Sequence, residues 1–256
     1  MNPLPYQDQV AIVTGAGKGT GGLGRAIAQR LAAGGARVMV SDVDPKVAES
    51  ASEITAATGA AALSFTGSLA VEDNVKRMVA ATMAAWGRVD ILINNAGGGI
   101  IKPFLEHDAA SFAATIDRNL WTAIWCCHKV LPNMIAQNYG RIVNIGADSL
   151  RTGIPNHAGY NAAKGGVIGM SVALARDFAA NNITINTVSP CLIHTSRFEA
   201  LKKSDPALAD KFERVIPKGR GVAIDEVVDA VCFLAKRETG FITGQDISIN
   251  GGSAMP

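Results

Sequence analysis

The stretch Val10-Ala-Ile-Val-Thr-Gly-Ala-Gly-Lys-Gly-Thr-Gly-Gly-Leu-Gly24 places a short apolar strand, a glycine-rich loop and the start of a helix in direct succession. Glycines in such a loop let the backbone turn sharply and approach a pyrophosphate, whose charge the N-terminus of the helix stabilises. A Walker-type loop does not fit, because Lys18 is followed by Gly19 rather than by Ser or Thr. The stretch predicts a dinucleotide-binding loop, with candidate contacts at Gly15, Gly17, Gly19, Gly22, Leu23 and Gly24.

Asp42 follows the next apolar run, Arg37–Val40, about 20 residues after the glycine loop. A carboxylate at this place can hydrogen-bond the ribose hydroxyls of an adenosine, and it repels a 2′-phosphate. The cations of Lys18 and Arg37 favour NADP, but Asp42 is closer to the deciding position. The sequence therefore predicts NAD as the cofactor.

Short β-branched runs alternate with longer helical patterns along the chain, which is typical of a parallel sheet flanked by helices. The expected strands cover 10–13, 37–40, 61–65, 91–93, 141–145, 184–188 and 246–249, and the expected helices cover 22–34, 46–58, 71–86, 108–137, 157–180 and 225–236. We expect one α/β domain over 1–256, with a doubly wound, Rossmann-like parallel sheet of seven strands and helices on both faces. The proline-containing break at about 190–224 predicts a substrate loop with room for short helices.

The composition favours a soluble protein that acts on a small molecule. The formal net charge is only +2 with scattered cations, which gives no reason to expect nucleic acid. The four cysteines lack CxxC spacing, the four histidines lack metal-ligand spacing, and no apolar run reaches the length of a bilayer. The start of the chain lacks the basic and apolar regions of a signal peptide. We expect a cytoplasmic protein with no metal and no membrane partner.

Tyr160 and Lys164 stand four residues apart in the helix expected over 157–180. Residues i and i+4 share one face of a helix, so the phenol and the ammonium would point the same way. A neighbouring positive charge favours the phenolate and lowers the pKa of a tyrosine. The pair predicts proton transfer to or from an oxygen.

Taken together, these residues resemble the short-chain dehydrogenase/reductase family over essentially the whole chain. The matching motifs are the loop from Thr14-Gly15, Asn94-Asn-Ala-Gly97, Asn119, Tyr160-x-x-x-Lys164, Asn186-Thr-Val-Ser-Pro190, Ile193-x-Thr195, Ile242-Thr-Gly-Gln245 and Asn250-Gly-Gly252.

The resemblance implies roles for individual residues. Tyr160 would exchange a proton with the substrate oxygen, and Lys164 would bind the nicotinamide ribose and help to lower the pKa of Tyr160. Asn119 would hold a water in the proton relay. Further cofactor contacts would come from Ser68, Leu69, Asn95, Ala96, Gly97, Pro190, Ile193 and Thr195.

Four departures from the family pattern accompany the resemblance. The glycine loop is three residues longer than usual, so either Gly19 or Gly22 can be its middle glycine. Ser68 replaces an Asp that often receives the adenine amino group, and Cys191 replaces a glycine after Pro190. Ala147 stands where the catalytic serine is expected, 13 residues before Tyr160.

Two interpretations of Ala147 remain open. In the first, the Ser149 hydroxyl replaces the missing one, or Asp148 or Ser149 polarises the substrate through a water. In the second, the site is impaired and the protein binds NAD without turnover. Retention of Tyr160, Lys164 and Asn119 favours the first interpretation, with Ser149 as the fourth candidate catalytic residue.

The sequence thus predicts an NAD-dependent oxidoreductase that interconverts a secondary alcohol and a ketone. The residues expected around the substrate are apolar and favour a hydrophobic, alicyclic or aromatic-derived alcohol: Ile100, Phe104, Leu150, Ile154, Leu192 and Phe198. The alternatives are a 3-oxoacyl thioester reductase and a non-catalytic NAD-binding protein on the same scaffold. The helices that carry Asn119 and Tyr160 and the last strand suggest a homotetramer, with a dimer as the alternative. The sequence leaves the particular alcohol and the direction of the reaction open.

Overall fold

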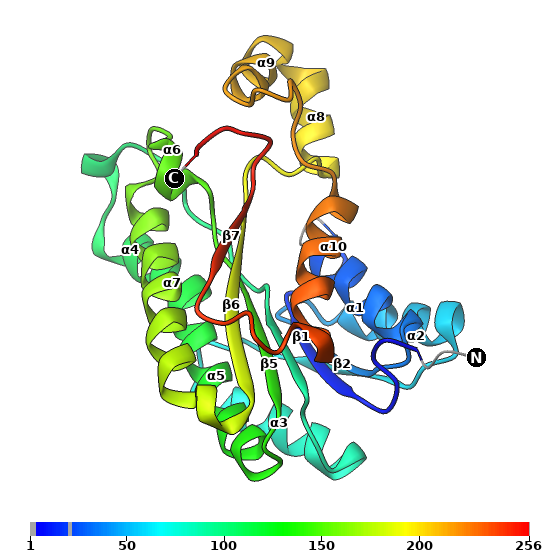
Figure 1. Ribbon diagram of the computed structural model, residues 1–256. Coiled ribbons are helices and arrows are strands. Elements are labelled where there is room, and N and C mark those ends of the chain that lie inside the picture. The colour runs from blue at the N-terminus through cyan, green and yellow to red at the C-terminus, as the bar shows by residue number, and fades with distance from the viewer. Residues whose placement is uncertain (1–3, 20–21, 256) are drawn as a thin grey trace.

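The computed structural model describes residues 4–19 and 22–255 and shows one parallel sheet of seven strands (Figure 1). Thr20 and Gly21 of the long glycine loop, and the first three residues considered for a signal peptide, lie outside the described residues. The strands are β1 (Val10–Thr14), β2 (Arg37–Asp42), β3 (Ala62–Thr66), β4 (Ile91–Asn94), β5 (Gly140–Ile145), β6 (Ile183–Pro190) and β7 (Asp246–Ile249). Their order in the sheet is β3-β2-β1-β4-β5-β6-β7, which confirms the doubly wound fold.

Helices cover both faces of this sheet. They are α1 (Leu23–Ala33), α2 (Val47–Thr58), α3 (Glu72–Trp86), α4 (Ala109–Ile116), α5 (Thr122–Ala136), α6 (Ser149–Thr152), α7 (Ala158–Phe178), α8 (Ser196–Ser204), α9 (Pro206–Arg214) and α10 (Ile224–Leu234). Figure 1 shows α1, α2 and α10 on one side and α4, α5 and α7 on the other. Within the described ranges, no helix is both long and apolar enough to cross a membrane.

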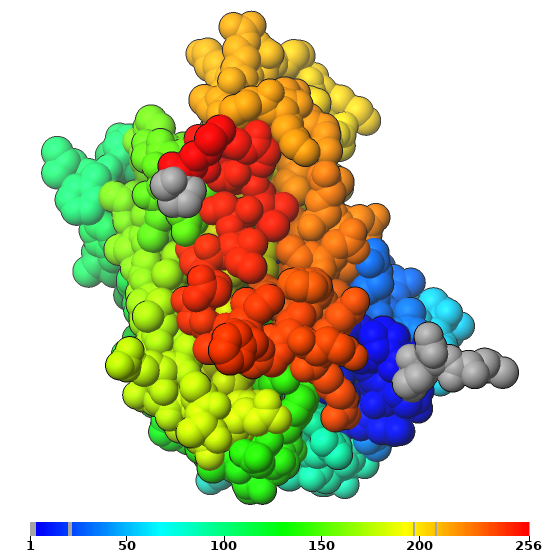
Figure 2. Space-filling view, viewed as in Figure 1, coloured from blue at the N-terminus to red at the C-terminus, as the bar shows by residue number. Residues whose placement is uncertain are grey.

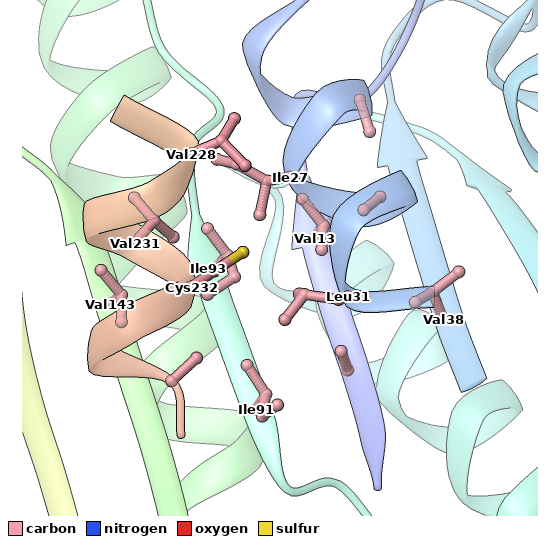
Figure 3. Close-up of a cluster of buried hydrophobic side chains, with 14 of the residues drawn as sticks. Val13, Ile27, Leu31, Val38, Ile91, Ile93, Val143, Val228, Val231 and Cys232 are labelled. Carbon is pink, nitrogen blue, oxygen red and sulfur yellow. The ribbon is translucent and has the colours of Figure 1, made fainter. Parts of the chain in front are cut away.

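The core consists of two apolar clusters, one on each face of the sheet. Side chains of a strand alternate between faces, so Ala11 and Val13 of β1 join one cluster while Ile12 joins the other. Figure 3 shows the first cluster, in which Ile27 and Leu31 of α1 pack between the strands and α10. Burial on both faces explains why the strands appear in the sequence as continuous apolar runs.

The order of the strands reverses at β1, which lies between β2 and β4 in the sheet. After β1 the sheet extends through β2 to β3, and then the chain returns to place β4 on the other side of β1. Loops that leave the carboxyl ends of these two strands must diverge, and ligands bind in the resulting crevice. The glycine loop leaves β1, and Asn95–Gly97 follow β4.

The structure divides one predicted helix and adds detail to the predicted substrate loop. The helix expected over 108–137 is divided by a π-helix, η2 (Asp117–Trp121), between α4 and α5. The break expected over 190–224 contains the helices α8 and α9, and β6 extends into it as far as Pro190. Figures 1 and 2 show α8 and α9 projecting from one end of the molecule. Because they follow the carboxyl end of β6, they lie beyond the same edge of the sheet as the crevice, the edge formed by the carboxyl ends of the strands.

Candidate active site

The first glycine of the loop makes the turn after β1 and permits close packing against the loop after β4. Gly15 has a φ of 66°, and a Cβ added there would lie 2.8 Å from the Ala96 Cα. Gly24, in the first turn of α1, lies so close that an added Cβ would overlap the Gly15 carbonyl oxygen. Asn95 fastens the two loops, because its Nδ2 donates to the carbonyl oxygens of Thr14 at 3.0 Å and Gly15 at 2.9 Å.

The structure distinguishes the two candidates for the middle glycine of the loop. Gly22 is the N-cap of α1 with a φ of 86°, and Leu23 is the first helical residue. Gly19 lies before the two residues outside the described part, and an added Cβ there would approach Asp44 no closer than 3.9 Å. The geometry expected of a glycine at the helix start is therefore found at Gly22.

Asp42, at the carboxyl end of β2, lies directly against the glycine loop. Its carboxylate accepts hydrogen bonds from Gly17 N at 2.9 Å and Asp44 N at 3.1 Å. A Cβ added to Gly17 would lie 2.7 Å from this carboxylate, so the loop and Asp42 fit only with glycine at that position. A carboxylate has about four lone-pair positions and can accept further bonds from a ligand.

The two cations that favoured NADP are placed unfavourably for that role. Lys18 Nζ lies 2.7 Å from Glu49 and 2.8 Å from Glu53, two carboxylates of α2 that neutralise it. Arg37 begins β2, five residues before Asp42. At about 3.3 Å per residue, that is roughly 16 Å from the edge where the glycine loop lies. The expectation that Arg37 favours NADP was therefore wrong.

The remaining candidate cofactor contacts lie in loops at the same edge of the sheet. Ser68 and Leu69 follow β3, where Gly67 N donates to the Asp42 carbonyl oxygen at 2.9 Å. Pro190 ends β6, and Ile193 forms an isolated bridge with Val222. Thr195 is the N-cap of α8, and its hydroxyl accepts from Phe198 N at 3.3 Å.

Tyr160 and Lys164 lie on one face near the N-terminus of α7, as their spacing predicted. The Lys164 Nζ lies 5.8 Å from the centre of the Tyr160 ring and donates to the Ile145 carbonyl oxygen at 2.7 Å. Lys164 is almost completely buried, whereas Tyr160 is half-buried. Gly97 brings the β4 loop to the same place, since a Cβ there would lie 3.3 Å from the Lys164 Nζ.

Asn119 joins this group from the π-helix. Its Nδ2 donates to the carbonyl oxygens of Thr115 at 2.8 Å and Gly98 at 3.0 Å, and its Oδ1 accepts from Gly98 N at 3.1 Å. A Cβ on Gly97 would lie 2.6 Å from that Oδ1, so glycine is required there. The Asn119 Nδ2 donates a hydrogen bond to the Thr115 carbonyl oxygen, which in a regular α-helix accepts from the backbone N–H four residues later. This competition accompanies the break in the predicted helix, and π-turns of this kind are frequent at functional sites.

Burial opposes charge on both members of the Tyr160–Lys164 pair. It raises the pKa of Tyr160 to about 12 and lowers the pKa of Lys164 to about 8. The sequence predicted a lowered pKa for Tyr160 from Lys164 together with the positive ring of a cofactor. In the protein alone, desolvation of the phenolate exceeds the attraction of the lysine.

Ala147 follows β5 and is 6% exposed. The nearby hydroxyl of Ser149 is directed elsewhere, because its Oγ donates to the Asn161 Oδ1 at 2.6 Å and Asn161 Nδ2 donates back to the Ser149 carbonyl at 3.0 Å. The Asp148 carboxylate also has other partners, because its two oxygens accept hydrogen bonds from Asn250 Nδ2 and Ser253 Oγ. The structure therefore brings Tyr160, Lys164 and Asn119 together but does not join Ser149 to them by a hydrogen bond.

The sequence is similar to those of known proteins over nearly its whole length. A family model described as enoyl-(acyl carrier protein) reductase matches residues 17–254. A 2,3-dihydroxy-2,3-dihydro-p-cumate dehydrogenase of Pseudomonas putida is 49% identical over 255 residues, covering 99% of this chain and 97% of that protein. The chain belongs to the short-chain dehydrogenase/reductase family. It is therefore an oxidoreductase scaffold of the kind that uses nicotinamide cofactors.

Two further matches agree with this family membership. A 1,6-dihydroxycyclohexa-2,4-diene-1-carboxylate dehydrogenase of Pseudomonas putida is 34% identical over 257 residues, covering 96% of this chain and 93% of that protein. The crystal structure of levodione reductase superimposes with a TM-score of 0.88 at 31% identity, covering 96% of this chain and 98% of that one. The family assignment made from the sequence is thus confirmed.

The residues that would hold a nicotinamide dinucleotide fit that group. The tight glycine cradle, the carboxylate of Asp42 and the N-terminus of α1 meet at the switch point of the sheet. Among the described residues, no group of three or more His, Cys, Asp or Glu side chains could hold a metal ion. Sequence reasoning missed the π-helix around Asn119 and the pairing of Ser149 with Asn161, since neither has a local sequence signal.

Proposed function

We propose that this protein is an NAD-dependent dehydrogenase that oxidises a secondary alcohol on a hydrophobic alicyclic ring, with a ring-derived vicinal diol as its substrate class. The observation that carries the proposal is the convergence of Tyr160, Lys164 and Asn119 beside the dinucleotide crevice. The names of two relatives support the substrate class, since both describe a six-membered ring with hydroxyls on neighbouring carbons.

The proposed reaction converts a cyclohexadiene diol and NAD into a catechol, NADH and a proton. The bound nicotinamide supplies the hydride acceptor for the carbinol carbon. The hydroxyl proton leaves to Tyr160 as the carbon–oxygen double bond forms. The resulting hydroxy-dienone then becomes aromatic by moving its ring proton to oxygen, and the gain of aromaticity favours oxidation.

Each member of the triad has a role that follows from its position. Tyr160 is the proton acceptor, because its hydroxyl takes part in no hydrogen bond to another described residue and is available to a substrate. Lys164 is held by the Ile145 carbonyl at 2.7 Å, which leaves two of its donors for a ribose and for stabilising the phenolate. Asn119 has its side chain fixed by three bonds, and its backbone carbonyl already accepts from Thr122 Oγ1 at 3.2 Å. The second lone pair of that carbonyl is the acceptor for a relay water in this proposal.

Three observations support NAD rather than NADP. The Asp42 carboxylate faces the loop where the adenosine ribose would lie, Lys18 is neutralised by Glu49 and Glu53, and Arg37 lies at the opposite end of β2. A 2′-phosphate would therefore meet the negative charge of Asp42, while Lys18 is already paired with two carboxylates. The helices α8 and α9 form the substrate loop in this proposal and contribute Phe198 to the apolar surroundings.

A 3-oxoacyl thioester reductase is the second candidate. A relative from Escherichia coli that is named a 3-oxoacyl-[acyl-carrier-protein] reductase, 35% identical over 253 residues, favours it. The proposed NAD preference speaks against this biosynthetic role. A non-catalytic NAD-binding protein has only Ala147 in its support.

One experiment separates these functions. The purified protein is supplied with NAD or NADPH and with a cyclic cis-diol, a simple secondary alcohol or a 3-oxoacyl thioester, and the absorbance of the reduced cofactor is followed. The dehydrogenase proposal requires diol oxidation with NAD that disappears in Tyr160→Phe while the variant still binds NADH. Faster thioester reduction with NADPH would establish the reductase, and tight NADH binding with no turnover would establish the non-catalytic protein.

We also propose that the protein is a cytoplasmic homotetramer, as the sequence suggested. Exposed apolar side chains on α5, α7 and the segment before them support this assembly: Trp121 is 40%, Ile135 38% and Val172 51% exposed. Trp121 also stacks on Trp125 with ring centres 5.5 Å apart, which forms a flat aromatic surface. Sedimentation velocity of the purified protein measures the number of subunits directly.

A further inference from the structure

The proposed dehydrogenase requires a hydrogen-bond donor to the alkoxide that develops during proton removal. Such a donor can contribute on the order of 10²–10³ in rate. In this family the expected donor position is occupied by Ala147, which has no hydroxyl. A replacement hydrogen-bond donor has to come either from a neighbouring side chain or from the substrate.

The backbone around Ala147 is fixed and cannot bring Ser149 into its place by a small shift. Gly146 N donates to the Val188 carbonyl at 2.8 Å, and Asp148 N donates to the Pro190 carbonyl at 3.0 Å, so both neighbours are joined to β6. Gly146 is also packed so tightly that an added Cβ would overlap the Ser189 Oγ. Ala147 is held between these two anchors with little room to move.

The polar side chains nearby are already committed to other partners. Ser149 begins α6 and exchanges two hydrogen bonds with the Asn161 side chain. The Ser189 hydroxyl donates to Asp246 Oδ1 at 2.6 Å, and Arg151 pairs with Asp246 Oδ2 at 2.8 Å. Within residues 4–19 and 22–255, no side-chain hydroxyl donates to the Tyr160 oxygen.

We propose that Ala147 makes the site selective for vicinal diols, because the second hydroxyl of the substrate occupies the space of the missing serine hydroxyl and donates to the reacting oxygen. This inference rests on the proposed function. Two oxygens on neighbouring carbons of a cis-diol lie about 2.8 Å apart, and the narrow O–H···O angle within the diol makes their hydrogen bond weaker than a straight one. The substrate thus carries its own donor, and a serine at this position would compete with it for the same volume.

The proposed step conserves atoms and charge. The reacting carbinol loses its hydride to the oxidised nicotinamide and its hydroxyl proton to Tyr160, and a carbon–oxygen double bond forms. The second hydroxyl keeps its proton throughout and only donates a hydrogen bond. A mono-alcohol undergoes the same step without this donor, so its reaction is the slower one.

The test uses three saturated substrates of one ring size, so that gain of aromaticity contributes to none of them. These are cis-cyclohexane-1,2-diol, cyclohexanol and cis-2-methoxycyclohexanol, which keeps the second oxygen but cannot donate from it. We expect the wild type with NAD to oxidise the diol with a kcat at least about 10-fold above that of the other two. In Ala147→Ser we expect kcat for cyclohexanol to rise by at least about 10-fold while kcat for the diol stays level or falls.

Every outcome of this test is informative. Equal kcat for the diol and its methyl ether in the wild type, or an equal gain for all three substrates in Ala147→Ser, overturns the inference and leaves the dehydrogenase proposal standing. No oxidation of any diol by the wild type refutes the dehydrogenase proposal itself. Ser149→Ala is the second variant: a folded protein that loses kcat by about 10²-fold on the diol would assign the donor role to Ser149 instead.

Discussion

Removing the charge of Asp42 while keeping its shape should weaken the preference for NAD. Asp42 is only 6% exposed, and its carboxylate accepts from Gly17 N and Asp44 N. In Asp42→Asn, one amide oxygen remains to accept from one of these groups. The substitution thus removes a negative charge from the edge of the glycine loop with little change in volume.

The size of the effect follows from charge separation. A 2′-phosphate in place of the ribose hydroxyl would bring its charge to about 4 Å from the carboxylate, a repulsion of about 4 kcal/mol at an effective dielectric constant near 20. Removing it should raise kcat/KM for NADP by up to about three decades. With NAD, a charge-assisted hydrogen bond becomes a neutral one, and we expect a loss of about 10-fold.

The assay measures kcat/KM for both cofactors at one fixed concentration of the diol, together with the melting temperature. Asp73→Asn is the matched control, since it removes an exposed carboxylate of α3 that pairs with Arg77 one helical turn away and makes no contact with the glycine loop among the described residues. The control should leave both cofactor constants unchanged. If Asp42→Asn folds normally and gains less than about threefold with NADP, the charge of Asp42 does not select the cofactor and the reasoning is refuted.

Three further predictions concern packing, protonation and assembly. Gly24→Ala should lose about 1–3 kcal/mol of stability, because the added Cβ would overlap the Gly15 carbonyl oxygen, and a denaturant titration against the wild type measures this loss. Because burial raises the pKa of Tyr160 to about 12, kcat/KM for oxidation should increase with pH. In Lys164→Met the inflection of the pH profile, measured with saturating NAD, should move to higher pH. An inflection that stays in place contradicts a role for the Lys164 ammonium. Val172→Asp on the exposed side of α7 should reduce the sedimenting mass below that of a tetramer, and an unaltered mass would place the interface elsewhere.

The sheet could be predicted closely because its signal is local. Each strand is a short β-branched run buried on both faces, and the structure places every one within about two residues of its expected bounds. The same holds for the spacing of Tyr160 and Lys164, which depends only on the geometry of one helix.

The choice of partners by polar side chains could not be predicted in the same way. Ser149 pairs with Asn161 across the turn that joins α6 to α7, and Lys18 is taken by carboxylates of α2 more than 30 positions along the chain. Both pairings depend on how helices and loops pack against one another in space. The spacing of residues in the sequence does not predict that packing. The π-helix at Asn119 is a further case, since the Asn119 side chain there bonds to Gly98 of another loop, about 20 positions back along the chain.

The burial of Tyr160 and Lys164 has a consequence for the order of events in the proposed reaction. With a pKa of about 12 on the phenol and about 8 on the amine, the protein alone disfavours the ion pair that proton abstraction needs. The positive charge of an oxidised nicotinamide would shift the balance toward the phenolate, while a reduced, neutral ring would not. The pKa of Tyr160 is then coupled to the oxidation state of the cofactor. Beside an oxidised nicotinamide the phenolate is favoured and can accept the proton of the alcohol, whereas beside a reduced ring the phenol is favoured and can donate its proton. Tyr160 would therefore act as an effective base for alcohol oxidation only in the enzyme that holds NAD.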